Sequence, residues 1–324
     1  MTDRTAIIVI GRNEGARLEA CLASLPKDTA GIVYVDSGST DGSVSAARRA
    51  GARVVELDPA IPFTAARARN AGVAALTAED LAPDYLQFID GDCTLASDWL
   101  ATANTFLDEA PKAAVVCGRR RERYPEMSVY NRLCDREWNT PVGQARACGG
   151  DALMRHSAFV AAGGFRDDLI AGEEPELCVR LRAAGWQVWR IDAEMVLHDA
   201  AMTRFGQWWK RARRAGFAAA QGAVLHGRGP DRHGMVQTLR PLFWGIGLPV
   251  VTVLGSFVTP WAVALFAAYP AQVIRLALRK GGKRGDWEEA VFLTLGKFPE
   301  TLGILDYTLR TIRGTRQAKI IEYK

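Results

Sequence analysis

The stretch "QFIDGDC" (residues 87–93) closes an apolar run with two carboxylates, Asp90 and Asp92, separated by one glycine. Burying a charge without a partner costs several kcal/mol, so a pair at the end of a buried segment predicts a bound partner. Side chains at i and i+2 of an extended chain point to the same side, and Gly91 lets a ligand approach the backbone. Two hard oxygen donors suit Mg²⁺ or Mn²⁺. A solvated acidic turn is the alternative interpretation.

Around this stretch, β-rich runs alternate with helical patterns as far as about residue 120. The runs are "AIIVI" (6–10), "IVYVD" (32–36), "RVVEL" (53–57), "YLQFID" (85–90) and "AAVVCG" (113–118). The segments between them carry apolar residues at helical spacing. This alternation predicts an α/β fold with right-handed βαβ units and a Rossmann-like, mostly parallel sheet. Ligands bind at the carboxyl ends of such strands, where Asp36 and Asp90 both stand.

Composition limits the function classes. The 324 residues are 48% hydrophobic and 24% charged, which excludes a disordered chain, and the net charge of +5 is mild. A basic stretch without a nucleic-acid motif gives no reason to expect nucleic-acid binding. Six scattered cysteines without a CxxC pair indicate reduced thiols rather than a disulfide framework or zinc site. The first apolar run is too short for a signal peptide, so we expect no secretion.

Beyond residue 120 the pattern changes twice. Residues 121–199 are less regular, and a basic, aromatic stretch, "RFGQWWKRARR" (204–214), follows them. The hydrophilic segment "HGRGPDRHG" (226–234) then predicts a boundary near residue 228. We therefore expect an α/β domain over residues 1–228 and a helical region over residues 229–324.

The C-terminal region contains an uncharged run from Leu242 to Ile274. It is long for one membrane span and short for two, and Pro260 is well placed for a turn, so a hairpin or re-entrant pair is predicted. Basic residues flank both ends, which puts both ends on the cytoplasmic side. We expect association with the inner (cytoplasmic) membrane, a cytoplasmic catalytic domain and an interfacial segment at 287–309. A buried helical pair of a soluble protein is the alternative.

Six short motifs occur in order between residues 7 and 185, namely "IIVIGRNE", "VDSGSTDGS", "ARARNAG", "FIDGDC", "GGF" and "GEEPELCVRLRAAG". Together they resemble the inverting glycosyltransferases of family 2, which have the GT-A fold. The resemblance covers most of the chain before the boundary and says little about the C-terminal region. It implies a nucleotide-sugar donor, a divalent metal (Mg²⁺ or Mn²⁺) and transfer of one sugar with inversion.

The resemblance also implies roles for individual residues. Those that would bind the nucleotide-sugar are Arg12, Asn13, Asp36, Arg67, Arg69 and Asp90. Asp92 would ligate the metal, with Asp90 near it and His198 approaching the metal or diphosphate. From the residues alone, "VDSGSTDGS" is equally a turn that caps the next helix, and His198 an ordinary residue at a strand end.

The acidic cluster "GEEPE" resembles the family's Glu-Asp pair, which supplies the general base. Glu174 stands where the family has Asp, so the choice lies between Glu173 and Glu174, and we favour Glu174. A base must deprotonate the acceptor hydroxyl as it attacks the anomeric carbon. Negative charges that merely favour a helix N-terminus are the alternative explanation of this cluster.

In the basic stretch, Arg204, Lys210 and Arg211 are candidates for an acceptor or lipid phosphate, and a solvated helix face is the alternative. "GQWWKRARR" only approximates the QxxRW pattern of polymer-building relatives, which favours single over processive transfer. We expect the run "RRRER" (119–123) to be solvated. The predicted acceptor is a polyprenyl-linked or polysaccharide-precursor glycan. The alternatives are a sugar-phosphate nucleotidylyltransferase, although a glycine-rich phosphate loop is missing, and a non-catalytic membrane scaffold.

Overall fold

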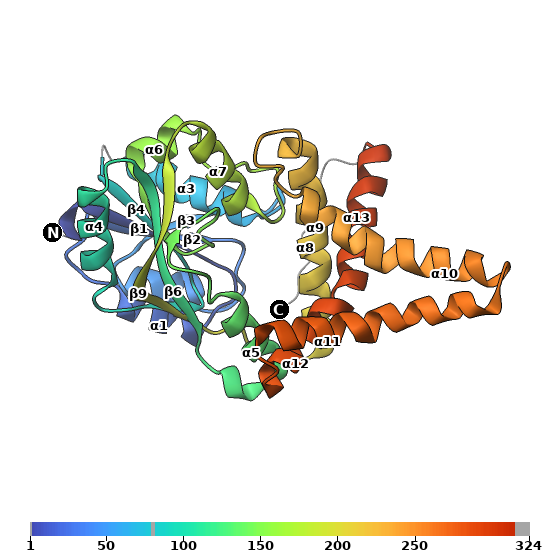
Figure 1. Cartoon of the computed structure of the whole chain (residues 1–324). Helices are drawn as coiled ribbons and strands as arrows, with labels where there is room; N and C mark the ends of the chain where they lie inside the picture. The colour runs from blue at the N-terminus through green and yellow to red at the C-terminus, as the bar shows by residue number, and fades with distance from the viewer. Residues whose placement is uncertain (1, 79–81, 315–324) are drawn as a thin grey trace. The chain divides into compact units, whose positions relative to one another are not determined.

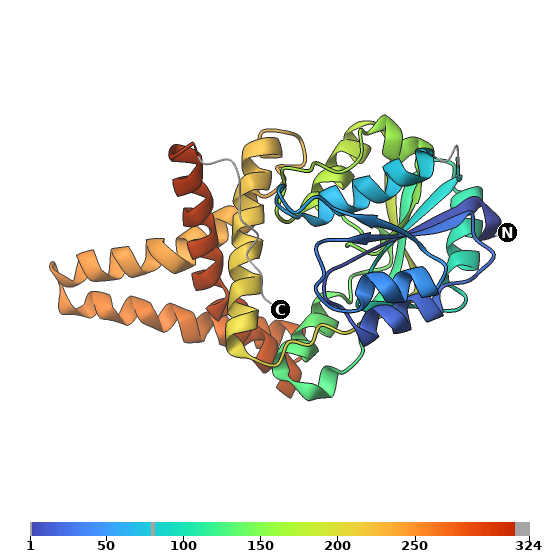
Figure 2. The ribbon, with the colours of Figure 1, turned by 180° about the vertical axis from the view of Figure 1, so that it is seen from behind.

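The computed structural model describes residues 2–78 and 82–314, and the chain divides into two compact units after Ala201. The first unit, seen in Figure 1 and from behind in Figure 2, is a mixed sheet covered by helices. Its strands are β1 (Thr5–Gly11), β2 (Gly31–Asp36), β3 (Arg53–Glu56), β4 (Tyr85–Asp90), β5 (Cys93–Leu95), β6 (Ala113–Glu122), β7 (Gly143–Gln144), β8 (Ala152–Arg155) and β9 (Gln187–His198).

The strand order is β3-β2-β1-β4-β8-β6-β9-β5, with β7 paired to β9. β1 to β4 run parallel, as the alternating pattern predicted, and β8 then enters antiparallel between β4 and β6. β1 and β4 are buried almost throughout, which is typical of strands covered on both faces. The predicted α/β fold is confirmed, and the antiparallel strands come mainly from the less regular part after residue 120.

The helices of the first unit are α1 (Ala16–Ser24), α2 (Ser43–Arg49), α3 (Ala65–Thr77), α4 (Trp99–Glu109), α5 (Val129–Glu137), α6 (His156–Ala161) and α7 (Glu173–Ala183), with short 3₁₀ turns η1 (Thr2–Arg4) and η2 (Pro125–Met127). Figure 1 shows α3, α6 and α7 on one side of the sheet and α1 on the other. α3 lies close to β1 because Gly72 has no side chain, and a Cβ there would come within 2.4 Å of Ile8. The missing side chain lets α3 pack directly on β1 and β2.

The strand register brings the sequence-predicted carboxylates to one edge. Asp36 pairs with Gly11 across β2 and β1, and Asp90 pairs with Ile10 across β4 and β1. The two carboxylates therefore flank the end of β1. The N–H of Gly91 donates to the carbonyl of Ile10 at 2.8 Å, so the chain turns at the glycine as expected.

The second unit is entirely helical where the structure describes it. Its helices are α8 (Phe205–His226), α9 (Met235–Leu242), the π-helical turn η3 (Phe243–Gly247), α10 (Leu248–Ser256), the 3₁₀ segment η4 (Pro260–Ala267), α11 (Ala268–Lys280), α12 (Arg284–Leu295) and α13 (Lys297–Ile312). α8 and α13 pack side by side at two glycines. A Cβ at Gly216 would lie 2.0 Å from the carbonyl oxygen of Glu300, and one at Gly303 would lie 1.9 Å from that of Arg213.

This close packing explains where the unit boundary falls. We expected a boundary near residue 228, with residues 204–226 in the catalytic domain, but the structure divides at Ala201 and Met202. The hydrophilic segment near residue 228 is a loop inside the second unit, between α8 and α9. The polar composition of residues 226–234 correctly indicates a loop. The packing of α8 against α13 could not be deduced from the sequence of α8 alone.

The apolar run of the second unit forms a helical hairpin (Figure 1). Two helices, Met235–Ser256 and Pro260–Lys280, are long and apolar enough to cross a membrane, and only 17% and 6% of their most apolar stretches are buried. Each helix extends beyond the uncharged run (242–274) into the flanking basic residues. The uncharged run alone was therefore too short for two spans. The turn falls just before Pro260, as predicted, and exposes Phe257 and Trp261 at its tip. This exposure argues against the alternative of a buried core pair.

Candidate active site

The carboxylate of Asp36 organises the loop that follows β2. Its Oδ2 accepts hydrogen bonds from the backbone N–H groups of Gly38 and Ser39 at 2.9 and 2.7 Å, and its Oδ1 accepts one from the hydroxyl of Tyr34. Asp36 is buried, and burial together with this carboxylate raises the pKa of the Tyr34 hydroxyl. The turn-forming interpretation of "VDSGSTDGS" therefore describes its local structure. A contact to a nucleobase stays a prediction.

The "GRNE" segment is joined to the same loop. Asn13 lies in the left-handed region at φ 56°, its N–H donates to Ser39, and its side-chain oxygen accepts from the N–H of Thr40 at 2.7 Å. The guanidinium groups of Arg12 and Arg67 lie over the ring of Phe63, at 5.6 and 5.8 Å from its centroid. The sequence-predicted residues Arg12 and Asn13 after β1, Asp36 of β2 and Arg67 of α3 thus lie beside one another, near the carboxyl ends of β1 and β2.

Arg69 joins the two acidic motifs. It is 2% exposed, and its guanidinium donates to Asp90 Oδ1 at 2.9 Å and to Glu173 Oε1 at 2.7 Å. Burial would lower the pKa of Arg69, but the two carboxylates raise it, so the charge is retained. Burial would likewise raise the pKa of Asp90, and Arg69 with Arg120 lowers it. The predicted phosphate-binding Arg69 is therefore held by carboxylates in this structure.

Arg120 and Asp151 complete this network, and neither was predicted. Arg120 lies 3.3 Å from Asp151 and 3.5 Å from Asp90, and its guanidinium covers the ring of Trp138 at 4.6 Å. Asp151 is fully buried and accepts the backbone N–H of Asp90 at 2.9 Å. Burial raises the pKa of Asp151 in spite of Arg120. The expectation that "RRRER" is solvated is wrong for Arg120, because the run lies in β6 and its side chains alternate across the sheet.

Asp92 and His198 meet across the pairing of β5 with β9. His198 Nε2 lies 3.3 Å from Asp92 Oδ2, and both residues are buried. Ligand atoms of Asp92, Cys93 and His198 all lie within 4.8 Å of one another. Carboxylate and imidazole donors suit Mn²⁺, whereas the thiol of Cys93 is a soft donor that Mn²⁺ does not prefer. The residues present therefore fit a divalent cation held by Asp92 and His198.

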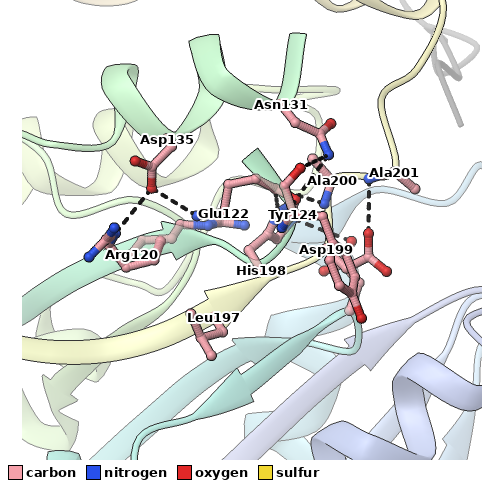
Figure 3. Close-up of polar contacts among 12 residues, drawn as sticks. Arg120, Glu122, Tyr124, Asn131, Asp135, Leu197, His198, Asp199, Ala200 and Ala201 are labelled. Carbon is pink, nitrogen blue, oxygen red and sulfur yellow. Dashed lines mark hydrogen bonds and ion pairs between the residues drawn. The ribbon is translucent and has the colours of Figure 1, made fainter. Parts of the chain in front are cut away.

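Behind His198 stands Glu122, a second unpredicted carboxylate (Figure 3). It is 3% exposed and accepts hydrogen bonds from Asn131 Nδ2 and the N–H groups of Tyr124 and Ala200. Its Oε2 lies 3.7 Å from Nδ1 of His198, a buried nitrogen with no hydrogen-bond partner among residues 2–78 and 82–314. A carboxylate behind a histidine is the usual support of a metal ligand, since it orients the ring and fixes the tautomer.

Glu173 and Glu174 begin α7 and point to different partners. Glu173 pairs with Arg69, whereas Glu174 forms no ion pair with a described residue. Oε1 of Glu174 accepts the N–H of Cys148 and lies 3.0 and 3.2 Å from the thiols of Cys148 and Cys178. Because Glu174 is not held in an ion pair with a described residue, its carboxylate is available to meet an acceptor hydroxyl. The choice of Glu174 over Glu173 stays a prediction supported by this difference.

The three cations predicted to meet an acceptor or lipid phosphate lie in the second unit. Arg204 precedes α8 and is exposed, as is Lys210, and Arg211 is half-buried. Gln207, the first residue of the approximate QxxRW pattern, accepts the N–H groups of Thr203 and Arg204 and so caps the helix. Their role in phosphate binding stays a prediction.

Comparison with known proteins shows which family the first unit resembles. The model of glycosyl transferase family 2 matches residues 6–169, about half of the chain. A succinoglycan biosynthesis protein of Rhizobium meliloti (ExoA) is 29% identical over 215 residues, which cover 61% of this chain and 64% of that protein. The pre-mycofactocin glycosyltransferase of Mycobacterium tuberculosis is 30% identical over 179 residues, 52% of this chain and 36% of the relative. The chain thus spans less than two thirds of these relatives.

A solved mannosyltransferase of Pyrobaculum calidifontis, in complex with GDP-Man and Mn²⁺, has the same fold. Its TM-score is 0.62 at 20% identity, and the match covers 93% of this chain and 87% of that one. The match confirms the predicted GT-A architecture. With the match of the family model to residues 6–169, these findings identify the chain as a member of glycosyltransferase family 2.

Proposed function

We propose that the protein is a metal-dependent, inverting glycosyltransferase that moves one sugar from a nucleotide-sugar to a lipid-linked or polysaccharide-precursor acceptor. The observation that carries this proposal is the convergence of Asp36, Asp90, Asp92, His198 and Glu174 from four separate segments on one end of the sheet. The Pyrobaculum enzyme, solved with GDP-Man and Mn²⁺, is a precedent for donor and cation on this fold. The similarity to a succinoglycan biosynthesis protein favours a polysaccharide precursor as acceptor.

In the proposed site, Asp92 and His198 hold the divalent cation, with Asp90 beside them. When bound, the cation supplies positive charge to the departing diphosphate. Arg69 and Arg120 fix the position of Asp90 through the ion pairs described above. Because Arg69 is buried, Arg120 is half-buried and both are already paired, their part is to orient the carboxylate rather than to move with the substrate.

The acceptor hydroxyl needs a base on the side opposite the leaving group. Oε1 of Glu174 accepts every hydrogen bond that this residue forms with the described residues, so Oε2 remains for the acceptor. Glu174 takes the hydroxyl proton as the acceptor oxygen attacks the anomeric carbon, and the bond to the nucleoside diphosphate breaks in the same displacement. One displacement inverts the anomeric configuration, and no nucleophilic side chain is required.

The exposed hairpin supports attachment to a membrane. Its helices are long enough for two spans, and basic residues flank the two ends of the hairpin, namely Arg228, Arg232, Arg240, Arg275, Arg279, Lys280, Lys283 and Arg284. By the positive-inside rule both ends lie on the cytoplasmic side of the inner membrane. The catalytic unit then works where nucleotide-sugars are made, on an acceptor that stays in the lipid.

Three variants of the full-length protein in detergent test the proposal. Binding of a panel of nucleotide-sugars is measured with and without Mn²⁺, and transfer is measured as labelled sugar entering a lipid or glycan fraction. Asp92→Ala should lose cation-dependent binding, and Glu174→Gln should keep binding but lose transfer. Glu173→Gln is the matched control for the base and should retain more transfer than Glu174→Gln. Donor binding that is equal with and without the cation, or a product of retained configuration, contradicts the proposal.

A further inference from the structure

We propose that Cys148, Glu174 and Cys178 form a second metal site, which binds a soft divalent cation of the Zn²⁺ class and so inhibits transfer. The site is separate from the Asp92–His198 pair. The inhibitory part rests on the proposed function, since it requires Glu174 to be the base. The binding part stands on the geometry of the three side chains alone.

The three ligand atoms already lie at metal-site distances. The sulfur atoms of Cys148 and Cys178 are 3.8 Å apart, and Oε1 of Glu174 lies 3.0 Å from the first and 3.2 Å from the second. All lie within 4.8 Å of one another. Two thiolates at about 2.3 Å from a tetrahedral zinc stand roughly 3.8 Å apart. A cation can therefore take the place of the thiol protons with little movement of the sulfurs.

The fold builds this cluster from one helix and one loop. Glu174 and Cys178 are four residues apart on α7 and share one face of the helix. Cys148 lies in the segment between β7 and β8, and its N–H donates to Glu174. The carboxylate thus anchors that segment against the helix and holds both thiols toward a single oxygen. Glu174 and Cys178 are buried, and Cys148 is half-buried.

The ligand type decides which cation is taken. Two thiolates select a soft or borderline ion such as Zn²⁺ or Cd²⁺, whereas Mg²⁺ and Mn²⁺ prefer the oxygen and imidazole donors of the other site. On binding, each thiol releases its proton to solvent and each sulfur forms one bond to the metal, without oxidation or reduction. Glu174 becomes a ligand and can no longer accept the proton of the acceptor hydroxyl.

A disulfide explains the pair of thiols less well. It needs sulfur atoms about 2.05 Å apart, so the two side chains would have to close by more than 1.5 Å. It would also remove both thiol donors from Glu174. In the structure the two sulfurs lie around the carboxylate oxygen, as ligands around a common centre.

Binding is tested on the reduced full-length protein in detergent, without oxygen and with excess Mg²⁺ to occupy the oxygen site. Cd²⁺ is titrated in, and the ultraviolet charge-transfer absorption of cadmium thiolates is recorded. We expect one saturable component that Cys148→Ser and Cys178→Ser each lose. Cys134→Ser, which changes a buried cysteine of α5, is the matched control and should keep it. An absorption unchanged by both serine variants overturns the site.

Inhibition is tested in the same preparations with Zn²⁺, each variant being compared with its own metal-free rate. Cys178→Ser should raise the half-inhibitory Zn²⁺ concentration by roughly 100-fold, since even outer partners of metal ligands contribute 10–100-fold to affinity. A chelator should restore the wild-type rate. Transfer that continues with saturated cadmium absorption overturns the inhibitory role. If the wild type transfers no sugar from any donor, the proposed function fails, and the cadmium absorption still decides the site.

Discussion

Replacement of Arg69 by Met tests the ion-pair network most directly. The guanidinium is 2% exposed and donates two charge-assisted hydrogen bonds, to Asp90 and Glu173. Each such bond contributes about 1.5–3 kcal/mol, and removing one partner of a buried pair costs about 3–5 kcal/mol. Met fills a similar volume, so the loss is mainly electrostatic. We expect the variant to lose about 3–5 kcal/mol of unfolding free energy at pH 7.

Arg67→Met is the matched control on the same helix. Arg67 donates to the neutral carbonyl oxygens of Asp58 and Ile61, so its loss should cost only about 0.5–1.5 kcal/mol. The free energy of unfolding of both variants is measured by urea titration of the full-length protein in detergent. The readout is a spectroscopic signal that reports on the β-sheet. The reasoning is refuted if the two variants lose the same stability.

The stability that Arg69→Met loses relative to the wild type, its deficit, should depend on pH. This dependence is a second, independent check. In the wild type the pKa of Asp90 is lowered, so the stability from its ion pairs is present near neutral pH and decreases as pH falls through that low pKa. Without Arg69, burial and the neighbouring carboxylates raise the pKa of Asp90 relative to the wild type, and a proton relieves the repulsion. The deficit should therefore shrink as pH falls from 7 toward the ordinary carboxyl pKa of about 4. A deficit independent of pH contradicts this account.

Three other predictions follow from the packing. Asp151→Ala removes a fully buried carboxylate and leaves Arg120 with Asp90, so urea unfolding should show a loss of about 1.5–3 kcal/mol for the lost charged interaction. Gly303→Ala inserts a Cβ 1.9 Å from a backbone oxygen of α8, so thermal unfolding should show a loss of about 1–3 kcal/mol or more in stability. Gly206→Ala, which has open space around it, is the control and should not lose stability. Phe257→Glu at the hairpin tip should weaken liposome flotation at least tenfold, because burying such a side chain contributes about 1.5–3 kcal/mol, and Val160→Glu on the first unit should leave it unchanged.

The sequence alone determined the first half of the sheet and the edge on which the site forms. The apolar runs that end at Asp36 and Asp90 are continuous in the chain, so their strands and their ends follow from local pattern. The uncharged run with Pro260 near its middle likewise predicted the hairpin and its turn. In both cases the decisive information lies within a few consecutive residues.

Only the tertiary structure decided which charges are partners. Arg120 of β6 meets Asp151, the residue before β8, and Glu122 lies behind His198 of β9, because β6 lies between β8 and β9 in the sheet. Whether a basic segment such as "RRRER" is solvated or buried depends on its neighbouring strands. The sequence of the segment does not contain that information. The sulfur atoms of Cys148 and Cys178, thirty positions apart, meet because the loop between β7 and β8 lies against α7. Strand ends are local, whereas pairing across a sheet depends on chain order, register and the handedness of the connections.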